Sequence, residues 1–224
     1  MRPTAVYLGW QGSEVSTNVE SLLRERLDVV FAREFAFGEP FDQDEIAPHG
    51  VDYLFSFGPL IVRKALLDRV RRAAVNLHTG PPRWPGRGSV SFALLEDDAE
   101  FGVTAHLMAA AVDAGPILRV VRFPISADDD VESLDARTKS AIPELAETVL
   151  DDLLASGEPR PSGDHWERAA LTQAELLERM RILDGDDEST VVRKIRAFAH
   201  PAKPGPYVER FGHRFWYRTG DGLR

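Results

Sequence analysis

Three polar residues of this chain have the types and spacing needed for acyl-transfer chemistry. Asn76 and His78 stand two positions apart at the end of the apolar run 73–77. Because side chains alternate along a strand, both would point to the same side. A carboxamide beside an imidazole can stabilise an oxyanion and move a proton. Taken alone, the pair fits a turn asparagine beside a surface histidine equally well.

Asp113 is the third candidate, and it lies in a Val-Asp-Ala-Gly turn. Apolar runs at 101–108 and 117–125 flank this turn and predict two strands. A carboxylate next to a histidine fixes its tautomer and stabilises its charged form. An aspartate that caps its own turn is the simpler explanation of the same pattern.

The elements that would position these residues alternate between strand and helix. Further strands are predicted at 4–9, 28–32, 51–57 and 73–77, and helices at 16–27, 60–70, 89–96 and 131–154. Pro59 suits the first turn of the second helix, and Ser89 suits the N-cap of the third. The pattern predicts an α/β fold: a Rossmann-like, mostly parallel sheet with helices on both faces. Ligands bind at the carboxyl ends of such strands, where His78 lies.

The last seventy residues predict a small C-terminal appendage of helices and a β-hairpin. A Gly/Pro/Ser-rich linker at 155–164 precedes predicted helices at 172–183 and 189–198. Strands at 207–210 and 213–217 would form a hairpin across Phe211-Gly212. We therefore expect a catalytic domain at 1–155 and an appendage at 156–224.

Composition excludes several classes of protein. The chain has no cysteine, so disulfides and thiolate chemistry are excluded. His49, His165, His200 and His213 have no partners at metal-ligand spacing, so no metal site is expected. We expect a cytoplasmic protein that neither spans a membrane nor binds nucleic acid, because no apolar stretch is long enough and the net charge is -9. The basic stretch 193–224 fits a solvated surface, or else a patch that meets a phosphate-bearing ligand.

The order of motifs between residues 52 and 154 carries a family resemblance. Asn-Leu-His after a strand is followed by a Pro/Gly loop with a tryptophan, then Gly-Val-Thr-Ala-His, then Val-Asp-Ala-Gly-Pro-Ile. This combination resembles the formyltransferases that use N10-formyltetrahydrofolate. The resemblance implies this formyl donor, no metal, and a transferase that formylates an amine.

The resemblance also implies roles for individual residues. The catalytic residues would be Asn76, His78 and Asp113, with Asn76 donating to the oxyanion and Asp113 orienting His78. The donor's pterin pocket would be formed by Leu60, Ile61, Val62, Leu67, His106, Asp113, Gly115 and Asp128. Ordinary helix packing explains residues 60–67 as well, and a satisfied interior histidine explains His106.

Within the family, the nucleotide-sugar N-formyltransferases fit best, in lipopolysaccharide or O-antigen synthesis. The segment 193–198 and the hairpin resemble their C-terminal appendage, which implies a homodimer. Arg83, Trp84 and Arg87 would contact the nucleotide-linked amino sugar. Glycinamide ribonucleotide as acceptor, a formyltetrahydrofolate hydrolase and a non-catalytic folate-binding protein remain alternatives.

Overall fold

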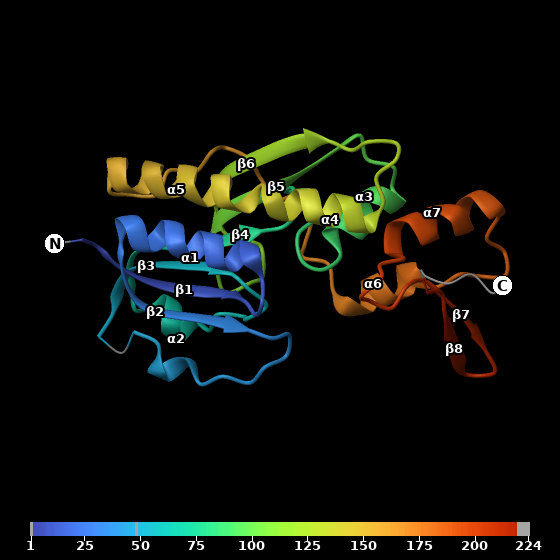
Figure 1. The fold of residues 1–224 in the computed structure, drawn as a ribbon, viewed down its shortest axis with the longest axis horizontal. Helices are drawn as coiled ribbons and strands as arrows, with labels where there is room; N and C mark the ends of the chain where they lie inside the picture. The colour runs from blue at the N-terminus through green and yellow to red at the C-terminus, as the bar shows by residue number, and fades with distance from the viewer. Residues whose placement is uncertain (1, 48, 219–224) are drawn as a thin grey trace.

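The computed structural model describes residues 2–47 and 49–218 of the 224-residue chain. A six-stranded sheet in the order β2-β1-β3-β4-β5-β6 forms its centre. Helices lie on both sides of the sheet, and the C-terminal elements gather beyond one end of it (Figure 1). The predicted α/β class, with its small appendage, is confirmed.

The sheet has a parallel half and an antiparallel half. Its strands are β1 (Thr4–Trp10), β2 (Asp28–Phe35), β3 (Val51–Phe57), β4 (Val70–His78), β5 (Glu100–Leu107) and β6 (Ile117–Pro124). The first four strands run parallel, whereas β5 and β6 each run antiparallel to the preceding strand. The central parallel strands β1 and β3 are rich in buried Val, Leu and aromatic residues, as expected for strands covered on both faces.

Two long helices cover one face of the sheet. Helix α1 (Glu14–Arg26) and helix α5 (Ile142–Ser156) pack against each other and against a core that includes Val75 and Leu77 of β4. Ser13 caps α1, since its hydroxyl accepts from the Ser16 N–H. Because β4 alternates, the neighbours of Val75 and Leu77 point to the opposite face.

That opposite face is covered by short elements. They are the 3-10 helix η1 (Gln43–Glu45) and the one-turn helix α2 (Lys64–Leu67). The predicted helix 60–70 is therefore wrong for most of its length: residues 60–63 are not helical, Arg63 is extended, and Val70 already begins β4. The side chain of Gln43 holds this segment out of a helix, because it bonds to the Ile61 carbonyl and the Arg63 N–H at 2.8 Å each.

The predicted helix 131–154 is in fact two helices. Helix α4 (Val131–Ser140) ends before Ala141, and α5 starts at Ile142. Pro143, at the start of α5, has no N–H and cannot continue a preceding helix. Helix α3 (Ser89–Leu95) forms as expected, but Gly88 is its N-cap and the Ser89 hydroxyl donates to Thr79 O instead.

The C-terminal elements are α6 (Gln173–Met180), α7 (Glu188–Phe198), β7 (Tyr207–Arg210) and β8 (His213–Trp216). They share one buried cluster with Trp84 and α3, so the appendage packs onto the main sheet domain through a common core. Most of its basic residues are paired with acids, including Arg193 and Arg196 with Asp97. This pairing favours the solvated-surface explanation of the basic stretch, of which residues 219–224 lie outside the described part.

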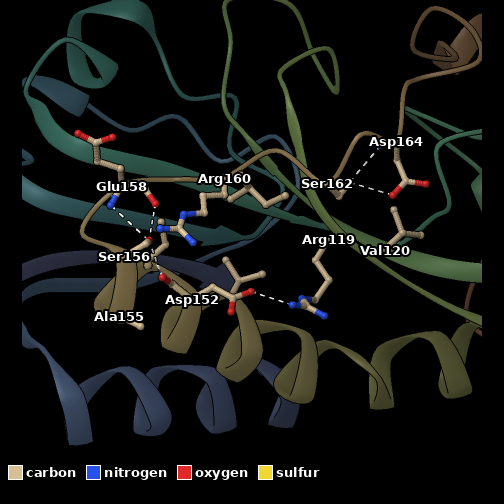
Figure 2. Close-up of a pocket in the computed structure, with 12 residues that line it drawn as sticks. Arg119, Val120, Asp152, Ala155, Ser156, Glu158, Arg160, Ser162 and Asp164 are labelled. Atoms are coloured by element: carbon tan, nitrogen blue, oxygen red, sulfur yellow. Dashed lines mark hydrogen bonds and ion pairs between the residues drawn. The ribbon is translucent and has the colours of Figure 1, made fainter.

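The linker between α5 and α6 packs along the edge strand β6. The Ser162 N–H donates to Ile117 O, and Asp164 pairs with Arg122 at 2.8 Å. Figure 2 shows the linker beside α5, with Arg119 of β6 reaching Asp152 across a shallow cleft. Within the described residues, no helix is long and apolar enough to cross a membrane.

Candidate active site

The end of β4 presents two polar side chains on the face away from α1 and α5. Val75 and Leu77 point into the core, so Asn76 and His78 point the other way. His106 on the adjacent strand β5 is directly paired with Asn76 in the sheet register. The Asn76 amide nitrogen lies 3.1 Å from Nε2 of His106. The expected placement of this pair on one side of the strand is therefore found.

Asp113 reaches the same place from the turn after β5. Its Oδ2 atom lies 3.2 Å from Nδ1 of His78, and its Oδ1 atom lies 3.2 Å from Nε2 of His106. Asn76 is 3.4 Å from Oδ1, and the Gly86 N–H donates to Oδ2 at 2.7 Å. One buried carboxylate thus joins both histidines, the asparagine and the Pro/Gly loop 79–88.

The backbone of Asp113 is in the left-handed region, with φ of 43°. A residue with a side chain adopts this conformation at an energetic cost, and such strain clusters at functional sites. Gly115 follows in the same turn. A Cβ atom there would collide with the carbonyl oxygen of Leu107, so only glycine lets the turn pack this closely.

His78 faces two hydrogen-bond acceptors. Its Nε2 atom lies 3.0 Å from the carbonyl oxygen of Trp84, and its Nδ1 atom faces Asp113. A neutral imidazole carries a single N–H, so it can satisfy only one of these two acceptors. His106 faces two acceptors as well: its Nδ1 atom lies 2.8 Å from Leu107 O, and its Nε2 atom lies 3.2 Å from Oδ1 of Asp113 and 3.1 Å from the Asn76 amide nitrogen. Both imidazoles therefore lie within hydrogen-bond reach of the Asp113 carboxylate, with which each can share a proton.

Burial and charge act on the titration of these groups in opposite directions. Burial lowers the pKa of His78 below its ordinary value, against the Asp113 carboxylate, which raises it. Burial alone would raise the pKa of Asp113, but His78, His106 and the Gly86 N–H together lower it to about 2. At neutral pH the site holds an ionised carboxylate beside a histidine that can accept a proton.

These polar groups line a cavity of about 430 Å³. Its walls come from the ends of β1, β3 and β4, the turn after β5, the Pro/Gly loop and the start of α6. The lining residues named in the sequence analysis are Asn76, His78, His106, Asp113, Leu60, Ile61, Val62 and Arg87.

Residues 60–62 line this cavity, and most of their main-chain groups have no hydrogen-bond partner among the described residues. The Gln43 side chain donates a hydrogen bond to the Ile61 carbonyl. The main-chain N–H and C=O groups of Leu60 and Val62 make no hydrogen bond to any other described residue. Ile61 is 68% exposed. This edge can therefore bind a flat heterocycle through the backbone, with apolar side chains beside it.

Five of the residues named from the sequence do not line the cavity. Leu67 is half-buried on α2, and Asp128 is exposed in the loop before α4, where the neighbouring Asp129 bonds to Arg137. The Gly115 carbonyl accepts from the Trp166 N–H, and Gly115 is not among the residues lining the cavity. Trp84 is 1% exposed, stacks on Phe92 and donates to Asp98, which also pairs with Arg83.

The burial of Trp84 leaves no ring face open to a ligand. A stacking role for Trp84 does not fit this burial. Arg83 pairs with Asp98 at 3.3 Å and does not line the cavity, and its ligand contact stays a prediction. Of the three residues expected to contact the acceptor, Arg87 alone lines the cavity.

The structure adds aromatic residues that motif reasoning missed. Trp10 and Phe37 line the mouth of the cavity, 37% and 61% exposed. Trp166 packs against both histidines, although its segment belongs to the predicted appendage. A lone tryptophan in a polar linker is a usable signal, since a large ring in such a segment usually packs on a neighbouring element. In the described residues, no group of three or more His, Asp or Glu side chains could hold a metal ion.

Comparison with known families bears directly on this site. The model of the formyl transferase family matches residues 32–150, which include every polar residue of the constellation. The chain belongs to this family. A methionyl-tRNA formyltransferase from Janthinobacterium sp. is 34% identical to it over 158 residues, 67% of this chain and 47% of the relative. The chain thus spans about half the length of the methionyl-tRNA formyltransferases it matches.

Solved structures of other formyltransferases share the fold over nearly the whole chain. A sugar N-formyltransferase from Shewanella sp. superposes with a TM-score of 0.80, covering 99% of both chains at 17% identity. An N-formyltransferase from Helicobacter canadensis, solved with folinic acid and dTDP-3-aminofucose, has a TM-score of 0.69 at 15% identity. The match covers 96% of this chain and 86% of that one. The C-terminal elements are therefore part of the shared fold.

Proposed function

We propose that this protein transfers a formyl group from N10-formyltetrahydrofolate to the amino group of a nucleotide-linked amino sugar. The observation that carries the proposal is the junction of two features in one cavity. The constellation Asn76, His78 and Asp113 lies in the same cavity as the free main-chain edge at Leu60 and Val62. Formyl transfer needs both an oxyanion-stabilising centre and a site for the carrier's ring.

The reaction requires three changes at the formyl carbon. The acceptor nitrogen forms a bond to this carbon, the bond from the carbon to N10 of the folate breaks, and a proton passes from the acceptor nitrogen to N10. The intermediate carries a negative charge on the formyl oxygen. In this proposal Asn76, whose side chain lines the cavity, donates to this oxygen, and to do so one of its amide N–H groups leaves His106 or Asp113.

His78 would move the proton. With Asp113 accepting the N–H on Nδ1, the Nε2 atom is free to take a proton from the attacking amine. In this structure Nε2 faces the carbonyl of Trp84 at 3.0 Å. Proton transfer through His78 therefore requires that the ring and the Pro/Gly loop separate by a small movement when the acceptor binds.

The choice of acceptor rests on the mouth of the cavity. The guanidinium of Arg87 lies 4.2 Å from the ring centroid of Phe37, and both side chains are exposed there. A cation beside an aromatic ring suits a ligand that combines a phosphate with a planar base. The likeness in fold to sugar N-formyltransferases over the whole chain supports the same choice.

Methionyl-tRNA is the second candidate acceptor, since the sequence relatives are methionyl-tRNA formyltransferases. The net charge of -9 opposes it, because a polyanion would be repelled by most of this surface. The pairing of Arg193 and Arg196 with Asp97 removes part of the one basic stretch that could offset this repulsion.

We also propose that the protein forms a homodimer through its C-terminal hairpin. Phe211, Phe215 and Tyr217 are 100%, 59% and 42% exposed, an apolar set on one small element. Sedimentation of the purified protein with and without Phe211→Ser and Phe215→Ser tests this assembly. A monomeric unsubstituted protein would rule it out.

The test of the acceptor is a panel of formylation assays. Purified protein is supplied with N10-formyltetrahydrofolate and, in separate reactions, nucleotide-linked amino sugars, glycinamide ribonucleotide, methionyl-tRNA, or no amine. We expect formyl transfer to an amino sugar, with affinity reduced in Arg87→Ala, and Arg83→Ala tests the contact predicted for Arg83. Transfer to another acceptor alone, or formate release without any amine, would replace the proposal with that activity. Folate binding without any product would show a non-catalytic protein.

A further inference from the structure

Trp166 is a half-buried indole that contacts both histidines of the candidate active site. Its ring centroid lies 5.8 Å from that of His78 and 5.0 Å from that of His106. The interplanar angles are 72° and 87°, so the rings meet edge to face, a favourable geometry for aromatic pairs. One side chain from the linker thus packs on the two rings that hold Asp113.

The indole also holds the turn that carries the carboxylate. The Trp166 N–H donates to the carbonyl of Gly115 at 2.8 Å. Gly115 is two residues after Asp113, whose backbone is strained. A hydrogen bond at this point restrains the turn in the conformation that aims Asp113 at His78.

Residues 165–172, named here the strap, fix the indole in place. The Glu167 N–H donates to Pro82 O at 3.1 Å, and the Leu171 N–H donates to Pro85 O at 2.9 Å. In return, the Arg87 N–H donates to Leu171 O at 2.9 Å. The strap is therefore hydrogen-bonded to the Pro/Gly loop at three points.

The Pro/Gly loop in turn supplies two contacts of the catalytic constellation. The carbonyl of Trp84 faces His78, and the N–H of Gly86 bonds to Asp113. A Cβ atom on Gly86 would collide with the carbonyl oxygen of Leu171, which shows how closely strap and loop approach. The strap thus acts on the site directly through Trp166 and indirectly through this loop.

We propose that Trp166 is a positioning residue: it holds the rings of His78 and His106 against Asp113 and keeps water from them. The role differs from that of a substrate contact, because Trp166 is not among the residues lining the cavity. It covers the histidines from the linker side, behind the cavity. The expected loss of kcat rests on the proposed function, whereas the expected change in the titration of His78 does not.

Loss of the indole has a defined electrostatic consequence. The titratable groups facing His78 are Asp113 and His106, with the Trp84 carbonyl and Trp166 completing its surroundings. Burial lowers the pKa of the His78 ring. If water enters where Trp166 was, this burial is reduced while Asp113 remains, so the pKa of His78 rises.

The experiment compares Trp166→Leu and Trp166→Phe with the unsubstituted protein. The titration of His78 is followed by NMR of the imidazole protons, assigned with His78→Gln, and needs no acceptor. We expect the pKa of His78 to rise by about one unit in Trp166→Leu. Trp166→Phe keeps a ring over the histidines, and we expect it to retain the original titration. Trp166→Met replaces the leucine variant if that variant does not fold.

Kinetics supply the second readout. In Trp166→Leu we expect kcat to fall about tenfold, with the affinity for the folate donor unchanged and the acidic limb of the pH profile moved upward. Trp216→Leu and Trp216→Phe are the matched controls, since Trp216 packs on Tyr207 away from the site. An unchanged His78 titration in the leucine or methionine variant overturns the proposal. A failure of every acceptor, with the titration moved as expected, would reject only the proposed function.

Discussion

The Nδ1 atom of His78 lies 3.2 Å from the Oδ2 atom of Asp113, although the two residues come from different segments of the sheet edge. The contact is buried, with both side chains less than a tenth exposed. A carboxylate and an imidazole at this distance can share and transfer a proton. Asn76, His106 and the Gly86 N–H all contact this pair through the Asp113 carboxylate.

Removal of the oxyanion donor tests the centre of the site. We expect Asn76→Ala and His78→Ala each to lower kcat by two to three orders of magnitude, about 3–4 kcal/mol, while the protein stays folded. The controls are Asn18→Ala and His213→Ala, whose side chains are exposed on α1 and β8. Near-normal turnover in Asn76→Ala or His78→Ala would contradict the assignment.

Asp113→Asn tests the charge at constant shape. Because the carboxylate raises the pKa of His78 against the effect of burial, its removal lowers that pKa further. We expect a large loss of kcat, and we expect the acidic limb of the remaining activity to move to lower pH. A pH-rate profile measures both effects. An acidic limb that stays in place would show that His78 and Asp113 titrate independently.

Because the pKa values of His78 and Asp113 are lowered in the folded protein, we expect the protein to lose stability in acid. His78 has a folded-state pKa below 6.5, so the unfolded chain binds more protons and stability falls as pH drops below 6.5. Asp113 contributes stability above pH 3.8 that is lost as pH falls toward 2. This second contribution is about 2 kcal/mol. Urea unfolding at a series of pH values measures the sum, and Asp113→Asn is expected to flatten the curve below pH 3.8.

Substitution of Gln43 is expected to weaken binding of the folate donor without slowing the chemical step. Its side chain bonds to Ile61 and Arg63 and so sets the shape of the main-chain edge. We expect Gln43→Leu to weaken donor binding by about 1–3 kcal/mol with little change in kcat at saturating donor. Isothermal titration with tetrahydrofolate checks the affinity. Equal affinity in the variant would show that residues 60–62 do not bind the ring.

Two glycines give a matched pair for the turn after β5. A Cβ on Gly115 would collide with the Leu107 carbonyl, so Gly115→Ala must displace the turn and is expected to abolish most activity. Gly157→Ala is strained by its φ of 75° but meets no atom within 4 Å, and should cost about 1 kcal/mol of stability without loss of kcat. Equal kinetic effects of the two would remove the turn from the catalytic machinery.

The parts of the fold predicted well from the sequence were those with strong periodicity. The strand 51–57 is found with the same bounds, and the hairpin is found within one residue. Helices were harder at their ends. Apolar residues at 60–70 fit a helical stripe, yet Gln43, which is distant in the sequence, keeps part of that segment out of a helix.

Site prediction shows the same division between local and distant information. The convergence of Asn76, His78 and Asp113 was predictable because motifs fix two of them at the end of β4 and the third in the turn after β5. Trp84 was misjudged because nothing local to its sequence shows that Phe92 and Asp98 enclose it. Trp166 was missed because its partners, His78 and His106, are far away along the chain.

The pairing of Gly86 with Leu171 also has a consequence for biosynthesis. A chain emerging from the ribosome exposes Asn76, His78 and Asp113 long before Leu171 follows, so the nascent sheet has its reactive groups but not the segment that secures them. Domains fold largely in the order in which they are made. Newly made molecules would therefore gain competence only late in translation, once Leu171 has emerged.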